Sequence, residues 1–145
     1  MPSRHEDWLR QAKKDINTAK KLKEECIFEW SCFISQQSAE KAIKAVYQKL
    51  NGEAWGHSLY GLLKGLEEKI EVPKEVFNCA KTLDKFYIPS RYPNGLVSGT
   101  PYEYFNEEDA KDAISCGEEI LRFCEDFLAE PTVSNRRTNK KSKET

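Results

Sequence analysis

Apolar residues recur at steps of three and four along nearly the whole chain, and this spacing constrains the fold more than any other feature. The first such series is Trp8, Ala12, Ile16, Ala19 and Leu22. A second stripe is Cys32, Gln36, Ala39, Ile43, Val46 and Leu50. Steps of this kind place side chains on one face of a helix. The pattern predicts helices at about 4–25 and 28–50, the second ending at Asn51-Gly52, where a left-handed residue stops the helix.

Three further helices follow from the same spacing. One carries Leu59, Leu62, Leu63, Leu66 and Ile70. The next opens at Pro73 and carries Val76, Phe77, Ala80, Leu83 and Tyr87. The last begins at Asn106, a good helix cap followed by three acidic residues, and ends before Pro131. Acidic side chains favour the first turn of a helix, which supports this start.

The stretch from Ile88 to Phe105 breaks the pattern. It contains three prolines and two glycines among several tyrosines, and breakers at this density exclude a helix. Neither strand-like alternation nor an internal repeat is found. The sequence therefore predicts an all-α, up-and-down bundle of four or five helices, with one long loop rich in Pro, Gly and Tyr before the last helix.

Composition fits one folded domain in 145 residues, with 39% hydrophobic, 32% charged and 11% aromatic residues. No apolar run approaches the roughly 18 residues that a membrane-spanning helix needs. The first seven residues lack the apolar core of a signal peptide, so we expect a cytoplasmic protein. The domain should cover residues 1–129, with residues 130–145 as a disordered basic tail.

Charge is nearly balanced overall, with 23 basic and 24 acidic residues, but it is unevenly spread. The tail contains five basic and two acidic residues, which leaves the body mildly acidic. An acidic body argues against capture of nucleic acid over the whole surface. The basic tail could contact nucleic acid or simply improve solubility, and without interleaved aromatic residues it is a weak signal of nucleic-acid binding.

The five cysteines are widely spaced and include no Cys-x-x-Cys pair, and the two histidines lie far apart in sequence. Such spacing argues against a structural zinc site. We expect no metal and no cofactor, and we interpret the cysteines as small buried apolar residues in a reducing compartment.

Several phrases, in order along the chain, resemble the HEPN family (higher eukaryote and prokaryote nucleotide-binding), in its prokaryotic stand-alone form. They are residues 8–15 (WLRQAKKD), 32–45 (CFISQQSAEKAIKA), 56–59 (GHSL) and 83–93 (LDKFYIPSRYP), with Asp109-Ala110 opening the last helix. The resemblance covers roughly residues 5–129.

This resemblance implies a four- or five-helix bundle that forms a homodimer through its helices. Some members of the family accompany a small nucleotidyltransferase in a two-gene toxin–antitoxin pair. Others are metal-independent ribonucleases, and still others bind nucleotides. The expected function is therefore a module that binds a nucleotide or acts with a separately encoded nucleotidyltransferase. A ribonuclease with a degenerate site and a dimerisation scaffold are the alternatives.

The ribonuclease members of the family use an arginine followed four to six residues later by a histidine. Arg91 is followed by no histidine at that distance, and Arg4 and His5 are adjacent. The missing spacing argues against an enzyme, although a pair assembled across a dimer stays open. His57 is the one histidine inside the expected fold, and we interpret it as structural, capping or packing beside a helix start.

The strongest candidate site is the segment from Asp84 to Tyr92. Arg91 could hold a phosphate bidentately, and Lys85, Lys41 and Lys44 could add positive charge. The rings of Tyr87 and Tyr92 could stack on a base. Alternatively, Arg91 pairs with Asp84 and only fixes a rigid elbow. Both hypotheses carry similar weight.

Polar residues also lie on the predicted second helix. Gln36, Gln37 and Glu40 either form hydrogen bonds within the bundle or across a dimer, or they line a ligand groove. The first interpretation is favoured for the glutamines. The apolar face of this helix is wider than one thin layer needs. We therefore expect part of it at the homodimer interface.

Overall fold

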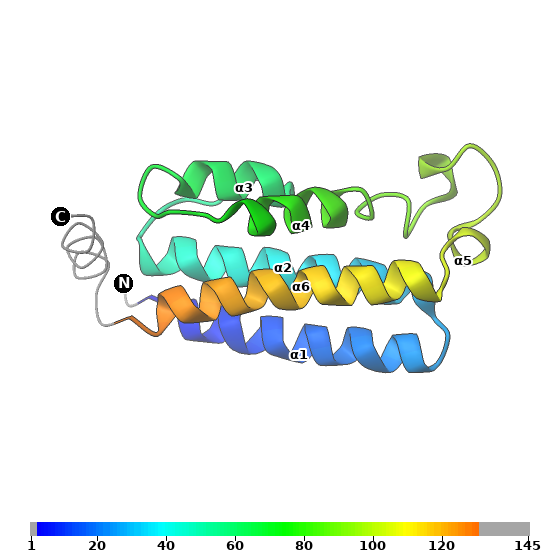
Figure 1. The fold of residues 1–145 in the computed structure, drawn as a ribbon, viewed down its shortest axis with the longest axis horizontal. Coiled ribbons are helices and arrows are strands. Elements are labelled where there is room, and N and C mark those ends of the chain that lie inside the picture. Colours follow the sequence, from blue (N-terminus) through cyan, green and yellow to red (C-terminus); the bar gives the residue numbers. More distant parts are fainter. Residues whose placement is uncertain (1–2, 131–145) are drawn as a thin grey trace.

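The computed structural model describes residues 3–130, and these form an all-helical bundle. Three long helices run side by side: α1 (His5–Glu24), α2 (Phe28–Lys49) and α6 (Glu107–Leu128) (Figure 1). The shorter helices α3 (Leu59–Leu66) and α4 (Lys74–Asp84) lie together over α2 and α6 (Figure 1). The predicted all-α bundle is therefore confirmed. The predicted tail, apart from Glu130, lies outside the described residues.

Helix α2 is the centre of the bundle, because α1, α3, α4 and α6 all contact it. Its packing against α1 is close: the Ser31 and Ser38 hydroxyls donate to the carbonyl oxygens of Ala19 and Ala12, at 2.8 and 2.7 Å. Both alanines are fully buried. Small side chains let two helix backbones approach, and the serine hydroxyls find partners without water. Most of the apolar face of α2 is covered within one chain, with Trp30 left 45% exposed, and the homodimer stays a prediction.

The helix ends follow local chemistry. Asn106 caps α6, accepting from the Asp109 amide at 2.9 Å while the Asp109 carboxylate accepts from the Asn106 amide at 3.0 Å. This reciprocal arrangement is a capping box. After α2, Asn51 adopts the left-handed conformation with φ of 57°. The starts and stops predicted at these two residues are confirmed.

The long loop differs from its prediction because it contains helical turns. A 3₁₀ turn spans Pro93–Gly95 and a short helix, α5, spans Pro101–Tyr104. Each begins at a proline, and a proline in the first helical position gives up a hydrogen bond that would be missing anyway. The exclusion of any helix here was therefore wrong. Ile70 and Tyr87 were also predicted on helices, and they lie just past the ends of α3 and α4.

The cysteines divide into three environments. Cys32 and Cys124 are fully buried, and burial raises the pKa of both thiols, which keeps them neutral. Cys79 and Cys116 are half-buried. Cys26 is exposed in the turn between α1 and α2, where it holds a φ of 62°, so its predicted burial was wrong.

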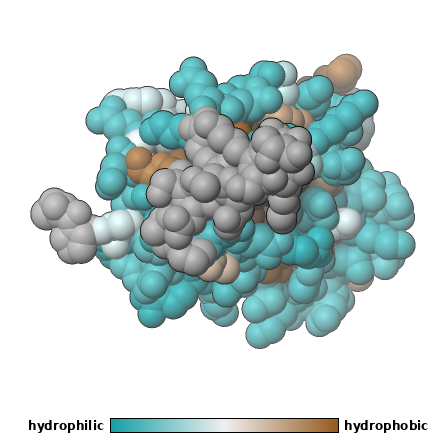
Figure 2. All heavy atoms as spheres, turned by 60° about the vertical axis from the view of Figure 1, so that its left-hand side comes forward, coloured by the Kyte–Doolittle hydropathy of each residue, from teal (hydrophilic) through white to brown (hydrophobic). Residues whose placement is uncertain are grey.

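The surface is largely polar. Figure 2 turns the end with the start of α1 toward the viewer, and outside the grey atoms its apolar groups form small, separate patches. Within residues 3–130, no helix is both long and apolar enough to cross a membrane. Three exposed tyrosines, Tyr92, Tyr102 and Tyr104, lie in the loop before α6, whereas the exposed Trp30 and Trp55 lie on α2 and in the loop after it.

Candidate functional site

The Arg91 side chain lies among three aromatic rings. Its guanidinium carbon is 4.3 Å from the ring centre of Phe33, 4.5 Å from that of Tyr87 and 4.9 Å from that of Tyr92. Stacked guanidinium groups keep their in-plane hydrogen-bond donors at the edges. The Nε atom donates to the Tyr87 carbonyl oxygen at 3.0 Å. No carboxylate within residues 3–130 forms an ion pair with Arg91, so its charge is available to an anion.

His57 lies against the same tyrosine ring. The centres of the His57 and Tyr87 rings are 5.2 Å apart and their planes differ by 19°, which is a stacked pair. The other contact is with Glu40, whose two oxygens lie 3.1 and 3.2 Å from Nδ1. The Tyr87 ring therefore contacts both His57 and Arg91. We call the five residues Phe33, His57, Tyr87, Arg91 and Tyr92 the Tyr87 cluster.

A polar stripe on α2 supports this cluster. Steps of three and four residues place the polar side chains of Gln36, Glu40 and Lys44 on one helix face, in line with Phe33 of the cluster. Lys44 Nζ donates to Glu40 at 3.1 Å. The Gln36 amide donates to Glu40 at 3.3 Å and to the His57 carbonyl oxygen at 3.2 Å. The predicted bonding of Gln36 within the bundle is confirmed, and it anchors the loop that carries His57.

The sequence-predicted candidates separate into two groups. The cluster brings together Arg91, Tyr87 and Tyr92. Lys44 pairs with Glu40, which in turn contacts His57 of the cluster. The remaining candidates are placed apart from it. Lys41 pairs with Asp15 of α1, and Lys85 is exposed at the end of α4.

Asp84 has a structural role that its sequence position did not reveal. Its carboxylate accepts from the amides of Leu59 at 2.8 Å and Tyr60 at 3.1 Å, and from the Ser58 hydroxyl at 3.2 Å. The carboxylate thus holds the end of α4 to the start of α3. The hypothesis that Asp84 pairs with Arg91 was wrong, because these three donors occupy it.

Replacing Asp84 with alanine should therefore act on stability. Two amides at the start of α3 would lose their acceptor, and losing a helix cap costs about 1–2 kcal/mol of unfolding free energy. Urea denaturation followed by circular dichroism measures this loss. Asp112→Ala, at an exposed site inside α6, is the matched control and should change stability by less than about 0.5 kcal/mol. Equal effects of the two substitutions would contradict the capping role.

His57 was predicted to cap or pack beside a helix start, and only the capping alternative is wrong. Ser58 is the residue that caps α3, accepting from the Gly61 amide at 3.1 Å, so His57 is not needed there. The residue does pack, as predicted, but against Tyr87 and beside Glu40. A signal was present in the buried polar stripe of α2, since polar residues on the inner face of a central helix require partners.

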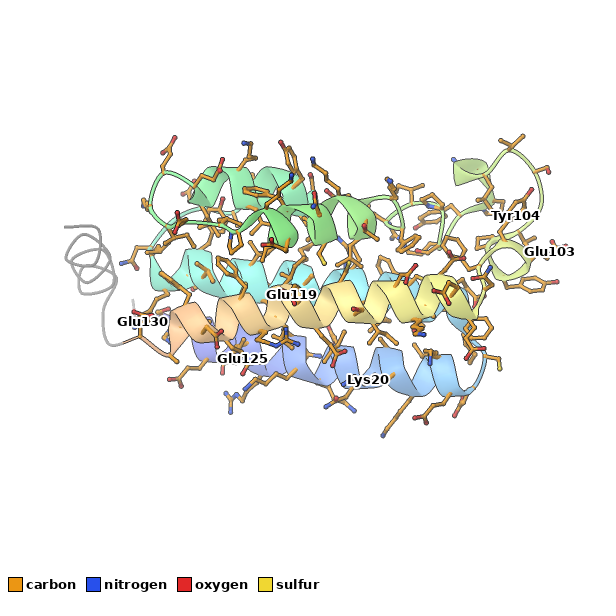
Figure 3. All side chains as sticks on the ribbon, in the orientation of Figure 1. Lys20, Glu103, Tyr104, Glu119, Glu125 and Glu130 are labelled. Carbon is orange, nitrogen blue, oxygen red and sulfur yellow. The ribbon has the colours of Figure 1, made fainter. Side chains whose placement is uncertain are left out.

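A separate groove of about 310 Å³ lies between α1 and α6. Ion pairs from Lys13 to Glu125, at 3.1 Å, and from Lys20 to Glu118, at 2.8 Å, join its two walls. Figure 3 places Lys20 and Glu125 between these helices, on the side away from α3 and α4. Among the described residues, no three His, Cys, Asp or Glu side chains meet as metal ligands would.

Comparison with known proteins gives consistent matches. The HEPN domain model matches residues 5–127. A Methanocaldococcus jannaschii protein named "Putative toxin MJ1304" is 30% identical over 133 residues, covering 85% of this chain and 87% of the relative.

Solved structures agree with this match. A Thermus thermophilus protein superimposes with a TM-score of 0.83 at 36% identity, over 86% of this chain and 98% of that one. An archaeal HEPN homologue superimposes with a TM-score of 0.76 at 40% identity, over 88% of this chain and 99% of that one. A HEPN domain protein of Thermotoga maritima superimposes with a TM-score of 0.71 at 37% identity, over 86% of this chain and 98% of that one.

Proposed function

Because the chain belongs to the HEPN domain family, we propose that it is a toxin-like module that binds the phosphate of a nucleotide at the Tyr87 cluster. The observation that carries this proposal is the state of Arg91. Its guanidinium carbon lies within 5 Å of the centres of three rings and lacks a carboxylate partner among the described residues. Arginine held in this way suits the bidentate binding of phosphate. Tyr92, which is 48% exposed, adds a ring on which a base can stack.

Titration calorimetry with ATP, ADP and adenosine tests this function. We expect ATP and ADP to bind and adenosine to bind at least tenfold more weakly, because the main contact is a charge-assisted hydrogen bond to phosphate. Equal binding of adenosine and ADP would move the site away from Arg91. The absence of binding by all three would remove the nucleotide proposal.

The partners in this proposal are a second copy of the chain and a separately encoded nucleotidyltransferase, both acting in the cytoplasm. The support comes from the family and from a relative named as a toxin. Sedimentation at micromolar concentration tests the homodimer, and a monomer there would contradict it. Size-exclusion chromatography of the chain with a nucleotidyltransferase encoded beside its gene tests the second partner, with a shared peak as the expected result.

A metal-independent ribonuclease is the second candidate, and one observation favours it. His57 and Arg91 contact the same tyrosine ring, although the sequence separates them by far more than the ribonuclease spacing. An imidazole can move a proton and a guanidinium can stabilise a charged phosphate. Cleavage of single-stranded RNA in EDTA that is lost in both His57→Ala and Arg91→Ala would support this function, and intact RNA would exclude it.

A further inference from the structure

Glu40 is an unusual residue for the inner face of a central helix. Its side chain is only 8% exposed, and a buried carboxylate is costly unless its oxygens are paired. Lys44 and Gln36, from the same helix, already supply a charge and a hydrogen bond. His57 is the third partner, and it comes from a loop 17 residues away in sequence. Glu40 therefore also binds His57, although two residues of its own helix already pair with it.

The contact with Glu40 determines which nitrogen of His57 carries the proton. An ionised carboxylate only accepts hydrogen bonds, so the nitrogen beside it, Nδ1, must be the donor. In the neutral ring Nε2 is then the acceptor. The side chain of His57 is 56% exposed, and Nε2 makes no hydrogen bond with residues 3–130. Glu40 thus presents a bare acceptor nitrogen to whatever binds there.

The Tyr87 ring fixes where that acceptor lies. Stacking on Tyr87 holds the plane of the imidazole, and the same ring contacts the Arg91 guanidinium at 4.5 Å. The hydrogen-bond acceptor of His57 and the cation of Arg91 thus both lie next to one ring. A ligand that matches both must carry an anion and, close to it, a hydroxyl that donates. A ribonucleotide has this combination in its phosphate and its ribose hydroxyls.

We propose that His57 determines specificity for ribose, because Glu40 fixes the tautomer in which Nε2 accepts a hydrogen bond from a ribose hydroxyl. The phosphate of the same nucleotide binds Arg91. Glu40 is a positioning residue that acts through His57 and does not touch the ligand. This inference rests on the proposed function and adds to it the sugar that the site recognises.

Calorimetry at pH 8 tests the specificity. ADP should bind roughly fivefold more tightly than 2′,3′-dideoxy-ADP, which is the effect of one neutral hydrogen bond. In His57→Ala the two ligands should bind equally. His5→Ala, which changes the other histidine, near the start of α1, is the matched control and should keep the difference.

The outcomes separate the inference from the function on which it rests. ADP that binds without discrimination, or discrimination that survives in His57→Ala, overturns the role of His57 and leaves the phosphate site standing. If neither nucleotide binds, the inference and the proposed function are both overturned.

The role of Glu40 has its own spectroscopic test, which needs no ligand. In the intact protein at pH 8, ¹⁵N chemical shifts of the His57 ring should identify a protonated Nδ1 and a bare Nε2. Glu40→Gln should shift the ring toward the opposite tautomer, because an amide can donate to Nδ1. A protonated Nε2 in the unchanged protein overturns the proposal directly, without depending on the folding of a variant. An unchanged tautomer in a folded Glu40→Gln variant overturns it as well.

Discussion

Replacing Ile43 with alanine is expected to lower the free energy of unfolding by about 2–5 kcal/mol. Ile43 is fully buried in the middle of α2, the helix that α1, α3, α4 and α6 contact. Removing three carbons there forfeits the transfer of apolar surface from water. It also leaves a cavity that the surrounding structure fills only in part. Phe33 and Glu40 of the site are on the same helix, so a cavity at Ile43 should also make the site less rigid.

Urea denaturation followed by circular dichroism measures this effect. Ile88→Ala removes the same atoms from a loop position that is 43% exposed, and it should cost less than half as much. Costs that are equal, or a loss below about 1 kcal/mol for Ile43→Ala, would contradict the central position of α2.

Replacing Arg91 with alanine is expected to weaken ADP binding by about 10- to 100-fold, the range for removing a hydrogen bond to a charged group. The affinity of Arg91→Lys for ADP should lie between those of the unchanged protein and Arg91→Ala. Lysine keeps the charge but loses the planar, bidentate fork that lies close to three rings. Calorimetry with ADP measures both variants.

The control for Arg91 is Arg122→Ala. Arg122 is an exposed arginine on α6 that pairs with Glu119 at 2.9 Å, outside the Tyr87 cluster. Its removal changes the net charge of the protein by the same amount, so it separates a local contact from general electrostatic attraction. ADP affinity that falls equally in the two variants, or in neither, would contradict the assignment of Arg91.

The fold was predictable because its information is local. Apolar steps of three and four residues define α1, α2 and α6, and Asn106 with Asp109 forms a cap from residues three apart. The short helix α5 was missed for a related reason. Proline was counted as a breaker, whereas Pro101 stands in the first turn, where it is compatible with a helix.

The site was predictable only in part, and the division again follows sequence distance. Tyr87, Arg91 and Tyr92 lie within six residues, and a turn after α4 brings them together. Phe33 and His57 join them from elsewhere in the chain, when α3 and α4 dock on α2. No spacing rule links His57 with Glu40, so only the tertiary structure brings the pair to the cluster.

The most direct test of the nucleotide site is a map of ADP binding by ¹H–¹⁵N NMR on the labelled protein. We expect the largest shift changes at the amides of Phe33, His57, Tyr87 and Arg91, all around one ring. The groove between α1 and α6 supplies the internal reference, and the amides of Lys13, Lys20 and Glu118 there should stay unchanged. Shift changes confined to that groove, or none at saturating ADP, would contradict the site.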